Sequence, residues 1–162
     1  MLNLLISPAD PTGSDATLLI QHLSAELGGR YGNDGAGAFS VEDVQIPRSA
    51  FVIAYVDGRP VGCGALKPFS PDMPNIVEVK RMFVEPDMRG QGLSRKILAK
   101  LENIALENGY DTVRLETGQK QPEAIGLYKS ARYYQIPCYG QYAHRPLSVC
   151  FEKKIFKEEE ER

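Results

Sequence analysis

Two glycines, Gly90 and Gly92, lie between a stretch rich in β-branched residues and a stretch with helical periodicity. Glycine at such a junction lets the backbone approach a ligand closely. The first amides of the following helix have no partners inside the helix and carry the positive end of its dipole, which suits a phosphate or pyrophosphate. Arg89 and Arg95 add positive charge beside these amides. The pattern predicts an anion site, although the same two glycines would also suit a simple tight turn.

The nucleotide-binding patterns fit this segment poorly. A Walker loop requires GxxxxGK[ST], which the chain lacks. The dinucleotide fingerprint GxGxxG needs a third glycine at the position of Arg95. Binding of ATP or NAD is therefore disfavoured, and an unrelated α/β phosphate-binding protein is left as an alternative interpretation.

The elements that would position this segment follow from hydrophobic periodicity. Residues 76–84 alternate and are rich in β-branched side chains, so we expect a long strand. Residues 94–108 carry apolar side chains at helical spacing, and Gly109 follows where a left-handed cap belongs. The glycines are therefore expected at a strand-to-helix junction.

The rest of the chain alternates between strand and helix patterns. Asp57-Gly58 suits the turn of a hairpin between residues 51–56 and 59–66. The order predicts a mixed sheet with packed helices and a strand–helix–strand crossover in the second half. We also expect strands at 3–6, 112–116, 138–142 and 148–155, a helix after 11–15 that Gly28-Gly29 ends, a helix at 122–133, a long loop with one short helix at 31–48, and a proline-stiffened loop at 67–74.

Length and composition indicate one globular domain. The chain has 162 residues, of which 43% are hydrophobic and 25% charged, and we expect a single domain at 1–157 followed by a charged tail at 158–162. A net charge of −2 disfavours a dedicated nucleic-acid-binding protein. The chain carries no apolar run long enough for a membrane span and no recognisable targeting signal, so a cytoplasmic protein is expected.

Cysteine and histidine usage argues against metal chemistry. Cys63, Cys138 and Cys150 are an odd number without CxxC spacing, which favours reduced thiols. Each is expected to act as a small buried hydrophobic side chain rather than as a nucleophile. His22 and His144 belong to no HExxH or Cys/His cluster, so no metal site is expected.

The segment Arg89-Gly90-Gln91-Gly92-Leu93-Ser94 resembles the Arg/Gln-x-x-Gly-x-Gly/Ala signature of the GNAT superfamily of acyl-CoA-dependent N-acyltransferases. The resemblance extends to residues 78–84, 115–118 and 121–128, and covers about residues 50–155. Two departures are Ser94, where Gly or Ala is usual, and Ala131-Arg132-Tyr133, where a glycine that ends the helix is common. The second departure leaves the exact end of that helix open.

The resemblance implies an α/β (α+β) fold with a mixed, mostly antiparallel central sheet and helices on both faces. The strand that ends near Val84 would splay from its parallel neighbour at a bulge, and the gap would admit the pantetheine arm of acyl-CoA. Residues implied to bind the coenzyme through backbone or side chain are Met82, Phe83, Val84, Arg89, Gly90, Gln91, Gly92, Leu93, Ser94 and Tyr128.

The implied activity is transfer of an acetyl group from acetyl-CoA to a primary amine by direct attack in a ternary complex, without a metal. The amine must lose a proton, and at a pKa of about 10.4 only about one molecule in a few thousand is neutral at pH 7. Glu78 is the first candidate for the general base and Glu116 the second. Glu78 alternates with Val77 and Val79, so we expect it on the opposite face, with Lys80 and Met82; a structural ion pair of Glu78 with Lys80 or Arg114 is the alternative.

Tyr128 matches the tyrosine that the family commonly uses as general acid toward the leaving thiolate, although it also suits a core aromatic side chain. A non-catalytic acyl-CoA-binding regulatory module of the same fold is an alternative function. The expected partner is a small-molecule or peptide amine, with no nucleic acid and no membrane, and the family implies a possible homodimer. The sequence does not identify the amine.

Overall fold

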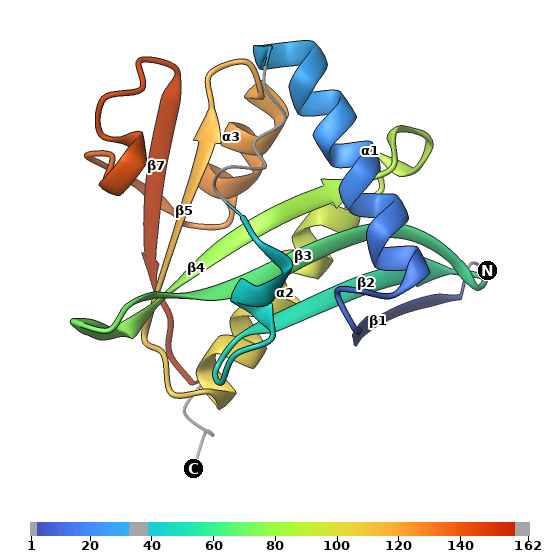
Figure 1. The fold of residues 1–162 in the computed structure, drawn as a ribbon, viewed down its shortest axis with the longest axis horizontal. Coiled ribbons are helices and arrows are strands. Elements are labelled where there is room, and N and C mark those ends of the chain that lie inside the picture. The colour runs from blue at the N-terminus through green and yellow to red at the C-terminus, as the bar shows by residue number, and fades with distance from the viewer. Residues whose placement is uncertain (1–2, 33–38, 158–162) are drawn as a thin grey trace.

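The computed structural model describes residues 3–32 and 39–157, so the expected tail at 158–162 lies outside the described residues. These residues form a seven-stranded sheet in the order β1-β2-β3-β4-β5-β7-β6, in which only β4 and β5 are parallel neighbours (Figure 1). The strands are β1 Leu4–Pro8, β2 Ala50–Val56, β3 Arg59–Ser70, β4 Met73–Val84, β5 Thr112–Gly118, β6 Tyr134–Ile136 and β7 Ser148–Lys154.

Helices cover both faces of the sheet, which confirms the expected mixed α/β fold. In Figure 1, α1 crosses in front of β2, β3 and β4, and α2 lies behind them. No helix among the described residues is long and apolar enough to cross a bilayer. The helices are α1 Ser14–Tyr31, α2 Leu93–Glu107 and α3 Pro122–Ser130, with short 3-10 helices η2 Val41–Val44, η3 Pro86–Met88 and η4 Gly140–Tyr142.

The sheet separates two hydrophobic cores. Phe51 and Ile53 of β2 pack with Leu19 of α1 on one face. Val52, between them in sequence, packs with Ile97 of α2 on the other face. Because successive strand residues point to opposite faces, a strand covered on both sides needs the unbroken apolar run that β2 has.

Gly62 of β3 is a position at which α2 packs closely on the sheet. A Cβ there would lie 2.8 Å from the Phe83 carbonyl oxygen and 2.9 Å from Ile97 Cδ1. We expect Gly62→Ala to lower the free energy of unfolding by about 1–3 kcal/mol through overpacking, as measured by urea denaturation. Gly126→Ala is the control, since a Cβ on exposed Gly126 of α3 meets nothing within 4 Å. Equal stability of the two variants would contradict this packing.

The parallel strands β4 and β5 separate soon after they pair. Their pairing covers Ile76 with Thr112, Val77 with Val113, and Glu78 with Arg114. β4 then continues to Val84 and β5 to Gly118 without further pairing between them. The expected splay is therefore present.

A bulge at Arg81 accompanies the splay. Arg81 has a φ of +55°, and the β3–β4 register shifts beside it. The extra residue reverses the side-chain alternation, so the expectation that Met82 shares a face with Glu78 and Lys80 is wrong. Met82 lies on the α2 face, where its Sδ would be 2.9 Å from a Cβ on Gly64, and Lys80 pairs with a residue of the α1 core.

Two helix ends differ from expectation. α1 runs through Gly28-Gly29 and ends at Tyr31. Its C-cap, Gly32, has a φ of +77° and donates its N–H to the Gly28 carbonyl at 3.0 Å. The cost of about 1 kcal/mol for each internal glycine is too small to end a helix that packs against a sheet. α3 ends at Ser130, and Arg132 takes the left-handed conformation in place of a glycine.

The expected strand at 138–142 and the loop at 67–74 are wrong. η4 occupies most of the first segment, and the short strand β6 precedes it. In the second segment, β3 and β4 pair as far as Ser70 and Met73, with only two residues between them. The prolines fit because this hairpin protrudes beyond β5, where few ladder hydrogen bonds are required.

Cys138 and Cys150 form a disulfide, which corrects the expectation of reduced thiols for these two residues. The pairing of β6 with β7 places Ile136 opposite Cys150 and so brings Cys138, two residues later, within a Cα–Cα distance of 5.1 Å. Linear spacing could not reveal this proximity. Cys63 is free and fully buried, and burial raises the pKa of its thiol to about 12, as expected for a packing residue.

Candidate active site

A cavity of about 740 Å³ opens where β4 and β5 separate, between α1, α3 and the start of α2. The loop before α2 lines this cavity, and so do Tyr142 and Arg145. Gln91 and Glu78 do not line the cavity. Of the residues predicted from the sequence to bind a coenzyme, the cavity wall contains Met82, Phe83, Val84, Arg89, Gly90, Gly92, Leu93, Ser94 and Tyr128.

The N-terminus of α2 presents unsatisfied amides to this cavity. Gly90 and Gly92 have φ values of +81° and +79°, and a Cβ on either would meet nothing within 4 Å. Within the described residues, the amides of residues 90–95 have no backbone acceptor, and no side chain caps the helix. The two glycines thus give the loop a left-handed course that leaves its N–H groups for an anion.

Two arginines flank these amides, and both have protein partners. Arg89 pairs with Glu26 of α1 at 2.8 Å and donates its Nε to the Val84 carbonyl at 2.8 Å. Arg95 donates to the Ser130 hydroxyl of α3. Arg89 therefore connects the loop to both α1 and β4. The sequence did not indicate that Glu26 would be its partner on α1.

Glu116 of β5 is one of the carboxylates that line the cavity. Burial raises the pKa of Glu116 to about 7. The positive charges of Lys80 and Arg145 act to lower this pKa, and the negative charge of Glu78 acts to raise it. The structure gives it no hydrogen bond or ion pair with any described residue. Glu116 can therefore gain or lose a proton near neutral pH.

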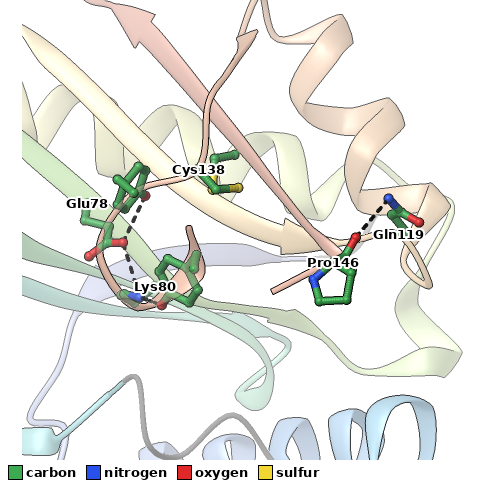
Figure 2. The surroundings of a disulfide bond; sticks show 8 residues. Glu78, Lys80, Gln119, Cys138 and Pro146 are labelled. Atoms are coloured by element: carbon green, nitrogen blue, oxygen red, sulfur yellow. Dashed lines mark hydrogen bonds and ion pairs between the residues drawn. A yellow bond between two sulfur atoms is a disulfide. The ribbon is translucent and has the colours of Figure 1, made fainter. Parts of the chain in front are cut away.

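Glu78 lies outside the cavity wall in a buried polar cluster (Figure 2). It is 6% exposed, pairs with Lys80 at 3.2 Å and accepts a hydrogen bond from the Tyr139 hydroxyl at 3.0 Å. Lys80 in turn donates to the Tyr142 hydroxyl. Burial acts to lower the pKa of Lys80, but Glu78 and Tyr142 outweigh it, so the net pKa is raised and the ammonium stays charged. The alternative of an ion pair between Glu78 and Lys80 is thus the observed arrangement.

Tyr128 of α3 combines a core position with access to the cavity. Its ring lies against Tyr133 and Phe151, with centroids 5.7 Å and 6.1 Å away. Its hydroxyl has no hydrogen-bond partner among the described residues, and the side chain lines the cavity. Burial, reinforced by Glu116, raises the pKa of Tyr128, so the hydroxyl stays protonated and can donate.

Tyr31, at the end of α1, is a wall residue that sequence analysis missed. Its hydroxyl donates to Gln121 Oε1 at 3.2 Å and accepts from the Lys120 amide at 3.1 Å. The ring lies directly on Gly118, where a Cβ would be 1.9 Å from the hydroxyl oxygen. The only sequence signal was a glycine at the end of a strand, which does not identify its partner.

Comparison with known proteins identifies the family of this chain. The acetyltransferase (GNAT) family matches residues 19–132. An IAA acetyltransferase of Azospirillum brasilense is 32% identical over 155 residues, which covers 96% of this chain and 100% of the relative.

Solved structures agree with this match. The crystal structure of a Klebsiella pneumoniae protein assigned as an acyl-CoA N-acyltransferase is 31% identical, with a TM-score of 0.78 over 94% of this chain and 98% of the other. At 19% identity, yncA of Salmonella typhimurium, solved with its cofactor acetyl-CoA, shares the fold, with a TM-score of 0.71 over 99% and 98% of the two chains. The chain therefore belongs to the GNAT family of acetyltransferases.

Proposed function

We propose that this chain transfers the acetyl group of acetyl-CoA to the primary amine of a small molecule or peptide, by direct attack in a ternary complex. The observation that carries the proposal is the continuity of one cavity. It joins the unsatisfied amides of α2, the opening between β4 and β5, and the side chains of Glu116 and Tyr128.

Main-chain groups would hold the coenzyme. The amides of residues 90–94 suit its diphosphate, because they are unsatisfied and lie at the positive end of the α2 dipole. Backbone groups of Met82 and Val84 would bind the pantetheine arm at the splayed edge of β4. The Val84 carbonyl already accepts from Arg89, so we assign the Val84 N–H to the thioester oxygen, where a fixed donor stabilises developing negative charge.

The acceptor amine needs a base, because its ammonium form predominates at neutral pH. Holding a lysine-like amine neutral at pH 7 costs about 4–5 kcal/mol. Sequence analysis placed Glu78 before Glu116, and the geometry favours the reverse order. Glu116 lines the cavity and has a pKa raised to about 7, whereas Glu78 is engaged by Lys80 and Tyr139.

Tyr128 would donate a hydrogen bond to the departing thiolate. A thiol pKa of about 8.5 lies below that of the phenol, so donation rather than full proton transfer is expected. Tyr128→Phe keeps the ring packing and should lower kcat by about 100-fold with little change in the KM for acetyl-CoA. Steady-state kinetics measures both, and Tyr133→Phe, which lies outside the cavity wall, is the control. A change confined to KM would contradict the assigned role.

The proposed function is tested by mixing the protein with acetyl-CoA and pooled amines, including polyamines, amino acids, aminoglycosides and lysine peptides. Release of free thiol and a mass increase of one acetyl group on an amine are expected. Thermal stabilisation by coenzyme A without thiol release from any pool would favour a binding module. Stabilisation by nucleotides instead of coenzyme A would overturn the proposal.

A further inference from the structure

Two oppositely charged side chains line the cavity without ion-pair partners among the described residues. Glu116 lines it from β5, and Arg145 lines it from the segment between η4 and β7. They are near enough for Arg145 to lower the pKa of Glu116, but they do not form an ion pair with each other. The Arg145 guanidinium instead lies 5.6 Å from the Tyr142 ring centroid.

Most other charged groups of the wall are already compensated by protein groups. Lys80 pairs with Glu78 at 3.2 Å, and Arg89 pairs with Glu26 at 2.8 Å. Glu123 pairs with Arg30 of α1 at 2.6 Å. Glu116 and Arg145 are therefore two opposite charges of the cavity wall that a ligand can still satisfy.

The segment that carries Arg145 is held against the end of β5. The Arg145 amide donates to the Tyr142 carbonyl at 3.1 Å. Gln119 fixes the next two residues, because its side chain donates to the Pro146 carbonyl at 3.4 Å (Figure 2) and its amide donates to the Leu147 carbonyl at 2.8 Å. The Cys138–Cys150 disulfide joins the residue before this segment, on the β6 side, to β7, which follows the segment. The backbone at Arg145 is thus held beside the end of β5, the strand that carries Glu116.

We propose that the acceptor is an amine that also carries a carboxylate, with its amine at Glu116 and its carboxylate at Arg145. A guanidinium that contacts an aromatic ring and has no ion-pair partner keeps N–H groups for bidentate binding of a carboxylate. Such an acceptor would satisfy both unpaired charges at once, whereas a simple amine would leave Arg145 without a partner. This inference rests on the proposed function, because it specifies the substrate class of the same cavity.

The test compares acceptors matched in everything except the carboxylate. Each of several amino acids is assayed beside its carboxamide and its decarboxylated amine, with thiol release as the measurement. The wild-type kcat/KM should be about 10- to 100-fold higher for the carboxylate. Arg145→Ala should remove this preference by raising the KM for the carboxylate alone, with the KM for acetyl-CoA unchanged, and Arg145→Lys should restore part of the preference.

Arg48→Ala is the matched control, because Arg48 is also exposed and lies over a tyrosine ring, that of Tyr110, but outside this cavity. It should keep the full preference. Equal acetylation of carboxylates and amides by the wild type would overturn this inference and leave the proposed function intact. A preference that survives Arg145→Ala would also overturn it. Thiol release from no amine at all would instead show that the proposed function itself fails.

Discussion

Gly92→Val should abolish binding of coenzyme A while the protein remains folded. Gly92 has a φ of +79° at the N-cap of α2, and a β-branched residue is strongly disfavoured there. The loop would relax to a negative φ and turn its amides away from the cavity. We expect at least a 100-fold loss of affinity, equivalent to about 2.8 kcal/mol, by isothermal titration calorimetry.

Gly109→Val is the matched control for this change. Gly109 follows the same helix at its other end and has a φ of +84°, so its replacement imposes a similar backbone strain. It does not line the cavity. Both variants should lose similar stability on urea denaturation, but only Gly92→Val should lose the coenzyme. Unchanged affinity for coenzyme A in Gly92→Val would show that the glycine loop is only a turn and does not bind the coenzyme.

Glu116→Gln should lower kcat/KM by about 100- to 10,000-fold near pH 8, the range typical of removing a general base. The pKa of Glu116 is raised to about 7, so its carboxylate loses the ability to accept a proton as the pH falls below about 7. The wild-type profile should therefore rise through about pH 7, and Glu116→Gln should lack this inflection. The variant should recover as the pH nears the amine pKa of about 10.4, where neutral amine is abundant in solution.

Glu78→Gln distinguishes the two carboxylates. Glu78 contributes to raising the pKa of Glu116, so its neutralisation should move the inflection to lower pH without removing it. The full pH dependence of kcat/KM, measured with saturating acetyl-CoA, tests both variants. An inflection that disappears in Glu78→Gln and persists in Glu116→Gln would reverse the roles.

Local sequence signals predicted much of the fold correctly. Asp57-Gly58 gave the hairpin because both residues adopt positive φ, at +50° and +83°. Apolar spacing and Gly109 gave α2 to within a residue at each end. These features depend on residues close together in the chain, which is why periodicity and turn chemistry were sufficient.

Features that depend on distant residues were not predictable in the same way. The bulge at Arg81 reversed the face of Met82, and no residue type in β4 marks the position where the alternation changes. The Cys138–Cys150 disulfide required the pairing of β6 with β7. The assignment of the general base to Glu116 rather than Glu78 depended on which carboxylate pairs with Lys80. That contact is made only in the folded chain.

The Cys138–Cys150 disulfide encloses a segment that carries the proposed acceptor-binding residue Arg145 and lies apart in the sequence from the proposed coenzyme-binding loop. We assign coenzyme recognition to main-chain groups, which every residue type except proline supplies in full, and acceptor recognition to the identity of a few side chains. The bond spans 12 positions and ties Tyr139, Tyr142 and Arg145 into one covalent ring. If the proposed acceptor site is correct, we expect a few substitutions within that ring to change the acceptor while the sheet and the proposed binding of acetyl-CoA stay unchanged.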